Sequence, residues 1–250
     1  MKDLAIVTGS ASGIGKTCAT RLNKKGIPVV GIDLADGDGN DLLASVKGDI
    51  SDPAAWNEAQ KKAGQFDGAP TIMIFAAAYL TVGNVLTLTD DDWDQVFNVN
   101  VHGLIKGLRT FLPGMIKQKR GSIVTIGSID SYMAEQGLIA YCGSKGAILQ
   151  ITRTLAMDHA RDGIRANCVC PGVTDTPFFR RHLDTASDPE QFVRVREQRN
   201  PLGRLLDPDE VAAMAVFLTS DESSGTTGAS IVVDAGLTAS FDFRTGEEGA

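Results

Sequence analysis

Short apolar runs alternate along the whole chain with longer segments in which apolar residues recur at helical spacing. Near-continuous apolar runs of this length are typical of strands buried on both faces of a parallel sheet. The longer segments fit the helices that connect such strands. The pattern therefore predicts an α/β fold, a doubly wound sheet of about seven parallel strands with helices on both faces. We expect the strands over residues 4–8, 28–32, 45–50, 71–76, 122–127, 164–170 and 230–234.

No linker, repeat or low-complexity tract interrupts this rhythm, so residues 1–250 are predicted to form a single domain. In open parallel sheets, ligands bind beyond the carboxyl ends of the strands. We therefore expect the functional residues in the loops that follow the strands.

Composition and charge narrow the class of partner. The net charge of -7 disfavours binding to nucleic acid, which requires a basic face. The N-terminus has no signal-peptide pattern, and the longest apolar run, residues 72–80, is shorter than the roughly 18 residues that cross a bilayer. We expect a soluble, cytoplasmic protein with no membrane partner and a small-molecule substrate.

Metal-ligating residue types lack the spacing of a metal site. The cysteines form no CxxC pair, and the histidines are far apart in sequence, so no metal is expected. The residues concerned are Cys18, Cys142, Cys168, Cys170, His102, His159 and His182.

The first predicted strand ends in the glycine-rich loop TGSASGIGK, which precedes an amphipathic segment. Glycines at this point permit a tight turn and let the backbone approach a pyrophosphate, which the N-terminus of the following helix attracts. The loop predicts a Rossmann-type dinucleotide site, with contacts from Gly9, Ser12, Gly13, Ile14 and Gly15.

Two carboxylates follow the next predicted strands. Asp33 comes 20 residues after Gly13, where a carboxylate accepts hydrogen bonds from the ribose hydroxyls of NAD. Asp49 and the adjacent Ile50 are candidates for contact with the adenine. A turn or cap role is the alternative for Asp49, and the sequence leaves both open.

A further group of polar residues lies in the middle of the chain. Tyr141 and Lys145 are four residues apart, so on a helix they project from one face. A solvated surface is the ordinary explanation for such a pair in isolation. Here Ser128 precedes Tyr141 by 13 residues at the end of a predicted strand, and Asn100 lies in FNVNVHG.

Taken in order, these motifs resemble the classical, NAD-preferring branch of the short-chain dehydrogenase/reductase family, and the resemblance covers nearly the whole chain. It includes PGVTDT at residues 171–176 and the ending TTGASIVVDAG. The resemblance implies an enzyme that transfers a hydride between NAD(H) and a secondary alcohol or ketone. It also implies a homotetramer or homodimer.

The resemblance assigns a role to each polar residue. Tyr141 is implied to be the general acid/base, and because a free tyrosine has a pKa of about 10, the Lys145 ammonium and the nicotinamide cation are expected to lower it. Lys145 is also implied to donate to the nicotinamide ribose. Ser128 is implied to orient the substrate oxygen, and Asn100 to hold a water that links Lys145 to bulk solvent.

Two further loops are implied to contact the cofactor. After Pro171, the backbone amides of Val173 and Thr174 are expected to meet the nicotinamide carboxamide, with the Thr176 hydroxyl nearby. The family's Asn-Asn-Ala-Gly motif is replaced by residues 75–78, Phe-Ala-Ala-Ala. Backbone contacts from Ala76 and Ala77 to the cofactor remain expected, but another group must satisfy the backbone atoms that the asparagines would bind.

The segment at about 177–207 is rich in arginine and corresponds to the family's substrate lid. Arg180 or Arg181 is a candidate clamp for a substrate carboxylate or phosphate, and a solvated helix face is the alternative. With Asp130, Glu135 and Gln136 they favour a polar pocket for a hydroxy acid or sugar-derived substrate. In the tail, about 240–250, two phenylalanines, Phe241 and Phe243, either dock on a neighbouring subunit or fray.

Two other functions remain as alternatives. One is an NAD-binding sensor without catalysis, which would not need the tyrosine. The other is a 3-oxoacyl-thioester reductase, which Asp33 disfavours because such reductases generally prefer the phosphorylated cofactor.

Overall fold

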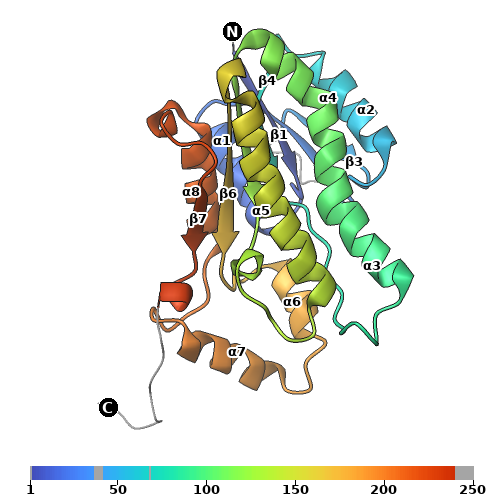
Figure 1. The fold of residues 1–250 in the computed structure, drawn as a ribbon. Helices are drawn as coiled ribbons and strands as arrows, with labels where there is room; N and C mark the ends of the chain where they lie inside the picture. Colours follow the sequence, from blue (N-terminus) through green and yellow to red (C-terminus); the bar gives the residue numbers. More distant parts are fainter. Residues whose placement is uncertain (1, 37–41, 68, 240–250) are drawn as a thin grey trace.

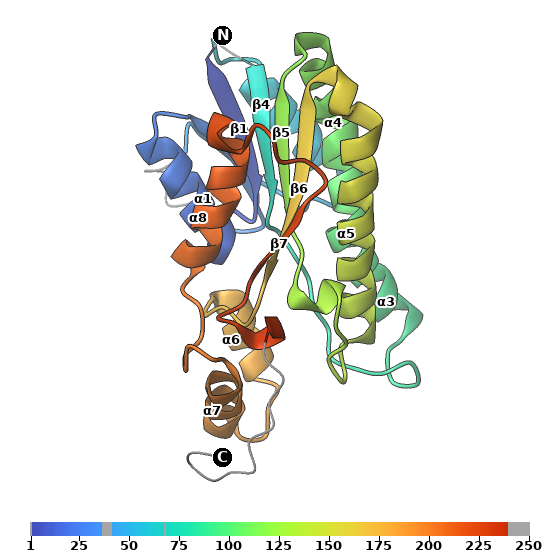
Figure 2. The ribbon, with the colours of Figure 1, turned by 60° about the vertical axis from the view of Figure 1, so that its left-hand side comes forward.

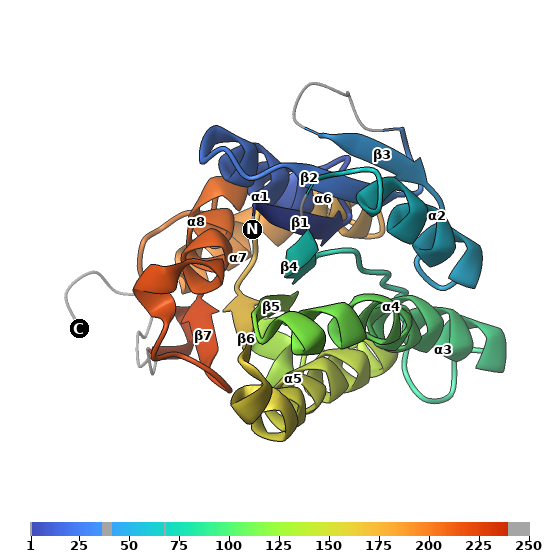
Figure 3. The ribbon, with the colours of Figure 1, turned by 90° about the horizontal axis from the view of Figure 1, so that it is seen from above.

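The computed structural model describes residues 2–36, 42–67 and 69–239. Seven strands form one parallel sheet in the order β3-β2-β1-β4-β5-β6-β7, with the reversal of strand order between β1 and β4. Figure 1 shows the fold, and the strand order can be followed in Figure 3. The strands are β1 Asp3–Thr8, β2 Val29–Asp33, β3 Ala44–Lys47, β4 Ala69–Phe75, β5 Gly121–Ile126, β6 Ile164–Pro171 and β7 Ser230–Val233.

Helices cover both faces of the sheet, as the view from above in Figure 3 shows. Helices α1 and α8 pack on one face, and α2, α4 and α5 pack on the other (Figures 2 and 3). The predicted doubly wound α/β fold is therefore confirmed. The helices are α1 Gly13–Lys24, α2 Pro53–Ala63, α3 Asp90–Phe97, α4 Gly103–Gln118, α5 Ile139–His159, α6 Pro177–Leu183, α7 Pro189–Arg199 and α8 Pro208–Thr219.

Three helices begin with the same local device, an aspartate followed by proline. Asp52, Asp188 and Asp207 are the N-caps of α2, α7 and α8, and each carboxylate accepts a hydrogen bond from a backbone N–H of the first turn. The proline occupies the first helical position, where its missing N–H costs nothing. These caps fix where the helices start after their loops.

The core is built in two layers, one on each face of the sheet. Trp56 on α2, which is 1% exposed, packs against Phe75 of β4 and Phe111 of α4. Gly107 of α4 is required there, because a Cβ at that position would collide with the Trp56 ring. The layer on the other face is made by α1 and α8, which carry Leu22 and Val216.

One predicted strand is too long. The third strand ends at Lys47 rather than Ile50, because Asp49 accepts a hydrogen bond from the backbone N of Ser51 (2.7 Å) and forms a turn that leads into α2. This turn leaves Asp49 and Ile50 at the carboxyl end of the sheet.

The arginine-rich segment forms α6 and α7, which lie beyond the carboxyl ends of β6 and β7 (Figures 1 and 2). The predicted tail with Phe241 and Phe243 lies outside the described residues. In the part of the chain that the structure describes, no helix has the length and apolar character needed to cross a membrane.

Candidate functional site

A cavity of about 360 Å³ opens at the carboxyl ends of the strands, around the reversal of strand order between β1 and β4. Every residue predicted to contact the cofactor lines it, from the glycine loop to Thr176. Of the four predicted catalytic residues, Ser128, Tyr141 and Lys145 also line it. Predicted site residues as far apart in sequence as Gly9 and Thr176, 167 positions, thus meet in one site.

The glycine loop is packed too closely for side chains. A Cβ on Gly15 would collide with the carbonyl oxygen of Gly9, and Gly9 and Gly13 have φ of +69° and +52°. These features leave the N-terminus of α1 directly at the cavity. Its N-cap residue, Ser12, makes no side-chain hydrogen bond to the first turn, so the N–H groups there are suited to an anion such as a pyrophosphate.

Asp33 anchors the loop to the end of β2. Its Oδ2 accepts from the backbone N of Ala11 (3.0 Å) and its Oδ1 from that of Ala35 (2.9 Å). A carboxylate offers about four acceptor positions, so capacity for a ribose diol remains. Asp49 makes the turn contact that the sequence left open as one alternative, and it also lines the cavity.

Thr8 binds the backbone of the segment that stands where the family has its asparagines. Its Oγ1, on a side chain that is 1% exposed, accepts from the backbone N of both Ala76 and Ala77 (3.1 Å each). The chain therefore ties the end of β4 to the end of β1 through a hydroxyl. This contact holds Ala76 and Ala77 against Gly9, where they line the cavity.

Asn100 lies behind the wall of the cavity rather than in it. Its Oδ1 accepts from the backbone N of Tyr79 (2.7 Å), and its Nδ2 donates to the Tyr79 carbonyl and to Ser144 Oγ (2.9 Å each). The residue sits in a π-helical turn, Asn98–His102, ahead of α4. Both amide protons are thus committed to the β4–α3 loop and to α5, and the water-holding role implied by the family stays a prediction.

Tyr141 and Lys145 are buried at 8% and 2% exposure, so the pair is not a solvated surface. Lys145 Nζ donates to the Ile126 carbonyl (2.8 Å) and lies 5.4 Å from the centre of the Tyr141 ring. Burial lowers the pKa of Lys145 to about 8. Below that pH the site keeps one buried positive charge beside the phenol.

In the chain by itself the Tyr141 pKa is shifted upward, and the lowering expected beside a nicotinamide cation stays a prediction. Burial raises that pKa, and the Asp130 carboxylate raises it further, whereas a hydrogen bond with Ser128 opposes the shift. Removing a phenolate from water costs more than the hydrogen bond with Ser128 returns. Any further stabilisation of the phenolate must come from a bound ligand.

A polar wall faces this pair. Asp130 accepts from Ser128 Oγ (3.0 Å), and burial raises its pKa to about 6. Glu135 pairs with Arg196 of α7 (2.6 Å), whose guanidinium lies 3.3 Å from the centre of the Phe192 ring. The polar pocket expected from Asp130 and Glu135 is therefore present, whereas Gln136 does not line it.

The arginines of the lid divide between two places. Arg181 lines the cavity, whereas Arg180 pairs with Asp175 (2.8 Å) and lines a separate hollow outside it. Arg196 and His182 also line the cavity and were not singled out in sequence. The arginine-rich composition indicated the segment, but not which side chains line the cavity.

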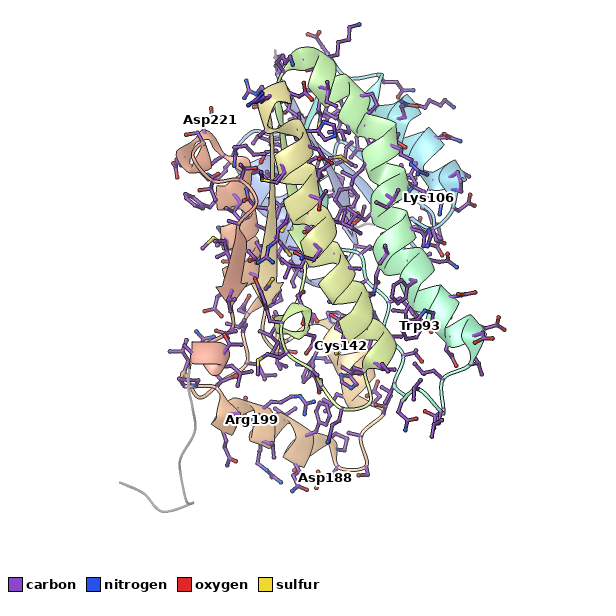
Figure 4. The ribbon with its side chains drawn as sticks, viewed as in Figure 1. Trp93, Lys106, Cys142, Asp188, Arg199 and Asp221 are labelled. Carbon is purple, nitrogen blue, oxygen red and sulfur yellow. The ribbon has the colours of Figure 1, made fainter. Side chains whose placement is uncertain are left out.

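Figure 4 labels Asp188 and Arg199, at the two ends of α7, beyond the sheet. It also labels Cys142, near the start of α5, at the same end of the molecule.

Within the described residues, no group of three or more His, Cys, Asp or Glu side chains is arranged to hold a metal ion.

Known proteins are similar to this chain in sequence and in fold. A family model described as "Enoyl-(Acyl carrier protein) reductase" matches residues 9–238. "Dehydrogenase/reductase SDR family member 6" of Aquarana catesbeiana is 33% identical over 237 residues, 92% of this chain and 95% of the relative. "Oxidoreductase UcpA" of Escherichia coli (strain K12) is 36% identical over 247 residues, 94% of each.

Among solved structures, the ligand-free aldohexose dehydrogenase of Thermoplasma acidophilum matches 98% of both chains with a TM-score of 0.92 and 27% identity. The chain belongs to the short-chain dehydrogenase/reductase family. It is thus an oxidoreductase of a family that typically uses a nicotinamide cofactor.

The Thr8 hydroxyl provides a first test. Replacing it in Thr8→Val keeps the shape of the side chain but leaves two backbone N–H groups without an acceptor. We expect a loss of about 1–3 kcal/mol in the free energy of unfolding, measured by urea denaturation, together with weaker NADH binding. Thr8→Ser keeps the hydroxyl and should lose less than half as much. Equal losses in both variants would contradict the role given to the hydroxyl.

Proposed function

We propose that this protein is an NAD-dependent dehydrogenase that transfers a hydride between NAD(H) and a polar secondary alcohol or ketone. The observation that carries the proposal is the meeting of the glycine loop and Asp33 with Ser128, Tyr141 and Lys145 in one cavity. The experiment that tests it is a screen of secondary alcohols, hydroxy acids and sugars with NAD, followed as NADH absorbance. A cytoplasmic homotetramer or homodimer is part of the same proposal.

The residues present fit NAD. The uncapped N-terminus of α1 and the glycine loop suit the pyrophosphate, and the Asp33 carboxylate suits an unphosphorylated ribose. Bound NAD supplies the hydride acceptor and, in its oxidised form, a positive charge. That charge adds to the Lys145 ammonium in favouring the Tyr141 phenolate, which burial and Asp130 disfavour by raising the Tyr141 pKa.

The chain's own groups handle the proton. In the oxidation direction, Tyr141 Oη takes the proton of the substrate hydroxyl while hydride leaves the carbon that bears this hydroxyl. In the reduction direction, Tyr141 returns the proton to the oxygen. Ser128 lies beside Tyr141 and orients the reacting oxygen. Lys145, positively charged below a pH of about 8, favours the phenolate electrostatically. Phe178 lies against the Tyr141 ring, 6.1 Å between centroids, and helps to exclude water.

The character of the wall favours a polar substrate. Asp130, Glu135, Arg181 and Arg196 all line the cavity, which suits a hydroxy acid or a sugar-derived alcohol better than a steroid. The aldohexose dehydrogenase among the structural relatives supports the sugar-derived choice. An NAD-binding sensor is disfavoured, because it would not need a buried tyrosine and lysine at the cavity. The description of the matching family model keeps acyl-thioester reduction as the second candidate, to be included in the screen.

Removal of the Tyr141 hydroxyl tests the assignment of the acid/base. Tyr141→Phe should bind NADH nearly as well as the wild type, measured by fluorescence titration, and lose at least about 10²-fold in kcat, the low end for a lost general acid/base. If the variant keeps most of its turnover on the substrate found in the screen, the proton travels by another route.

Asp33 tests the choice of cofactor. Two anions about 4 Å apart repel by roughly 4 kcal/mol near a protein surface, so the 2′-phosphate of NADP is disfavoured. We expect at least about a 100-fold preference in kcat/KM for NAD, or about 2.7 kcal/mol, and Asp33→Ala should narrow it. Asp36 is the matched control, because it pairs with Lys47 (2.8 Å). Comparable kcat/KM values for both cofactors in the wild type would refute the prediction.

The two neighbouring arginines of α6 test recognition of an anion. Arg181→Ala should raise KM for an acidic substrate more than for its neutral amide or alcohol analogue, because Arg181 lines the cavity. Arg180→Ala is the control, since Arg180 is paired with Asp175 outside it. If Arg181→Ala changes KM equally for both substrates, Arg181 does not bind the anionic group and belongs to a solvated helix face.

A further inference from the structure

The wall beside Ser128 carries a carboxylate that cofactor binding and acid–base chemistry do not explain. Asp130 lines the cavity, its Oδ2 accepts from Ser128 Oγ (3.0 Å), and its backbone N donates back to the same Oγ (3.1 Å). Within the described residues, no hydrogen bond uses the other carboxylate oxygen, Oδ1. One oxygen of a partly buried carboxylate is therefore left to accept a hydrogen bond from a ligand.

The spacing of these groups matches a particular substrate geometry. In the proposed reaction, the reacting oxygen lies within hydrogen-bond distance of Ser128 and Tyr141. The Asp130 carboxylate lies next to this position, because its Oδ2 is 3.0 Å from Ser128 Oγ. Neighbouring hydroxyl oxygens of a gauche 1,2-diol are also about 3 Å apart, close to an ordinary hydrogen-bond length. A diol can therefore place one oxygen at Ser128 and the next at Asp130.

We propose that Asp130 is a specificity-determining residue that accepts a hydrogen bond from a hydroxyl on the carbon next to the reacting carbon, so that the enzyme acts on vicinal diols and 2-hydroxy ketones. The inference rests on the proposed function and selects within it. An α-hydroxy acid would instead place its own carboxylate against Asp130 and near Glu135. Arg196 does not relieve that repulsion, because it is already paired with Glu135 (2.6 Å). An anionic group further along the substrate remains compatible with Arg181.

The same contact controls the Ser128 hydroxyl, which has a single proton to donate. Burial raises the pKa of Asp130 only to about 6, so at about pH 7.5 the residue is a carboxylate and draws that proton. A substrate hydroxyl that donates to Oδ1 draws negative charge away from Oδ2, so it weakens the hydrogen bond from Ser128 Oγ and frees the Ser128 proton for the reacting oxygen. The second hydroxyl therefore raises kcat as well as lowering KM.

Two matched pairs of alcohols test this inference at about pH 7.5 with NAD: cyclohexane-1,2-diol against cyclohexanol, and D-glucose against 2-deoxy-D-glucose. The step is the same for each: hydride leaves the carbinol carbon for NAD, the hydroxyl proton passes to Tyr141, and cyclohexane-1,2-diol yields 2-hydroxycyclohexanone. We expect the wild type to favour the diol of at least one pair by at least about tenfold in kcat/KM, the low end for a hydrogen bond to a charged group.

Variants of Asp130 should change the two members of a pair in opposite directions. Asp130→Leu, which has similar shape and no acceptor, should lower kcat/KM for the diol and raise kcat for the monoalcohol, because Ser128 is released. The kinetic constants of Asp130→Asn should lie between those of the wild type and those of Asp130→Leu. In a Ser128→Ala background, the gain for the monoalcohol should vanish. Glu135→Gln is the control, and it should change both members by the same factor. NADH affinity and melting temperature verify that each variant is folded.

The outcomes separate this inference from the proposed function. If Asp130→Leu changes both members of a pair by the same factor, Asp130 is structural and the inference is overturned, while the dehydrogenase activity stands. If neither diol is oxidised but other alcohols in the screen are, the inference also fails alone. If no alcohol, sugar or ketone supports turnover with NAD(H), the proposed function fails and the inference fails with it.

Discussion

The site depends on the burial of two ionisable side chains, Tyr141 and Lys145, one turn apart on α5. Burial shifts both away from their charged forms, since it raises the pKa of the phenol and lowers that of the amine. An acid/base that rests in its neutral form and is charged only when a cation arrives is suited to a reaction with an oxidised nicotinamide. The rest of the cavity holds this pair and brings the cofactor to it.

The supporting contacts form a continuous network of hydroxyls, amides and backbone groups. Thr8 fixes the end of β4 against the glycine loop, and Asn100 fixes the following loop to α5 through Tyr79 and Ser144. Ser131 extends the network, because its Oγ donates to the Lys145 carbonyl (2.9 Å) and accepts from the backbone N of Ser128 (3.2 Å). The proposed acid/base, the serine proposed to orient the substrate and the glycine loop are thus held in mutual register by short-range contacts.

The sequence was sufficient for the fold and for most of the site. Strands buried on both faces leave long apolar runs, so all seven strands could be located. Only the end of the third was misplaced by more than two residues, because Asp49 forms a turn there. Motif residues such as Asp33 and Tyr141 were found because backbone geometry fixes their spacing. The contact of Thr8 with the end of β4 was not foreseen, since the hydroxyl lies on another strand, 68 residues away from Ala76.

The sequence also could not predict which residues of the segment 177–207 line the cavity. Arg180 and Arg181 are adjacent on a short helix, and only the packing of α6 against its neighbours decides that one lines the cavity and the other pairs with Asp175. Likewise, the sign of the Tyr141 pKa shift depends on burial and on Asp130, which a motif does not reveal.

The measurement that most directly tests this account is the ionisation of Tyr141 itself, followed by phenolate absorbance at about 295 nm as pH is raised. Because the chain has three tyrosines, the signal is taken as the difference between the wild type and Tyr141→Phe. We predict that saturating NAD lowers the midpoint of the Tyr141 ionisation by at least about one pH unit relative to the free protein, and that NADH does not. An identical transition in the free and NAD-bound protein would contradict it.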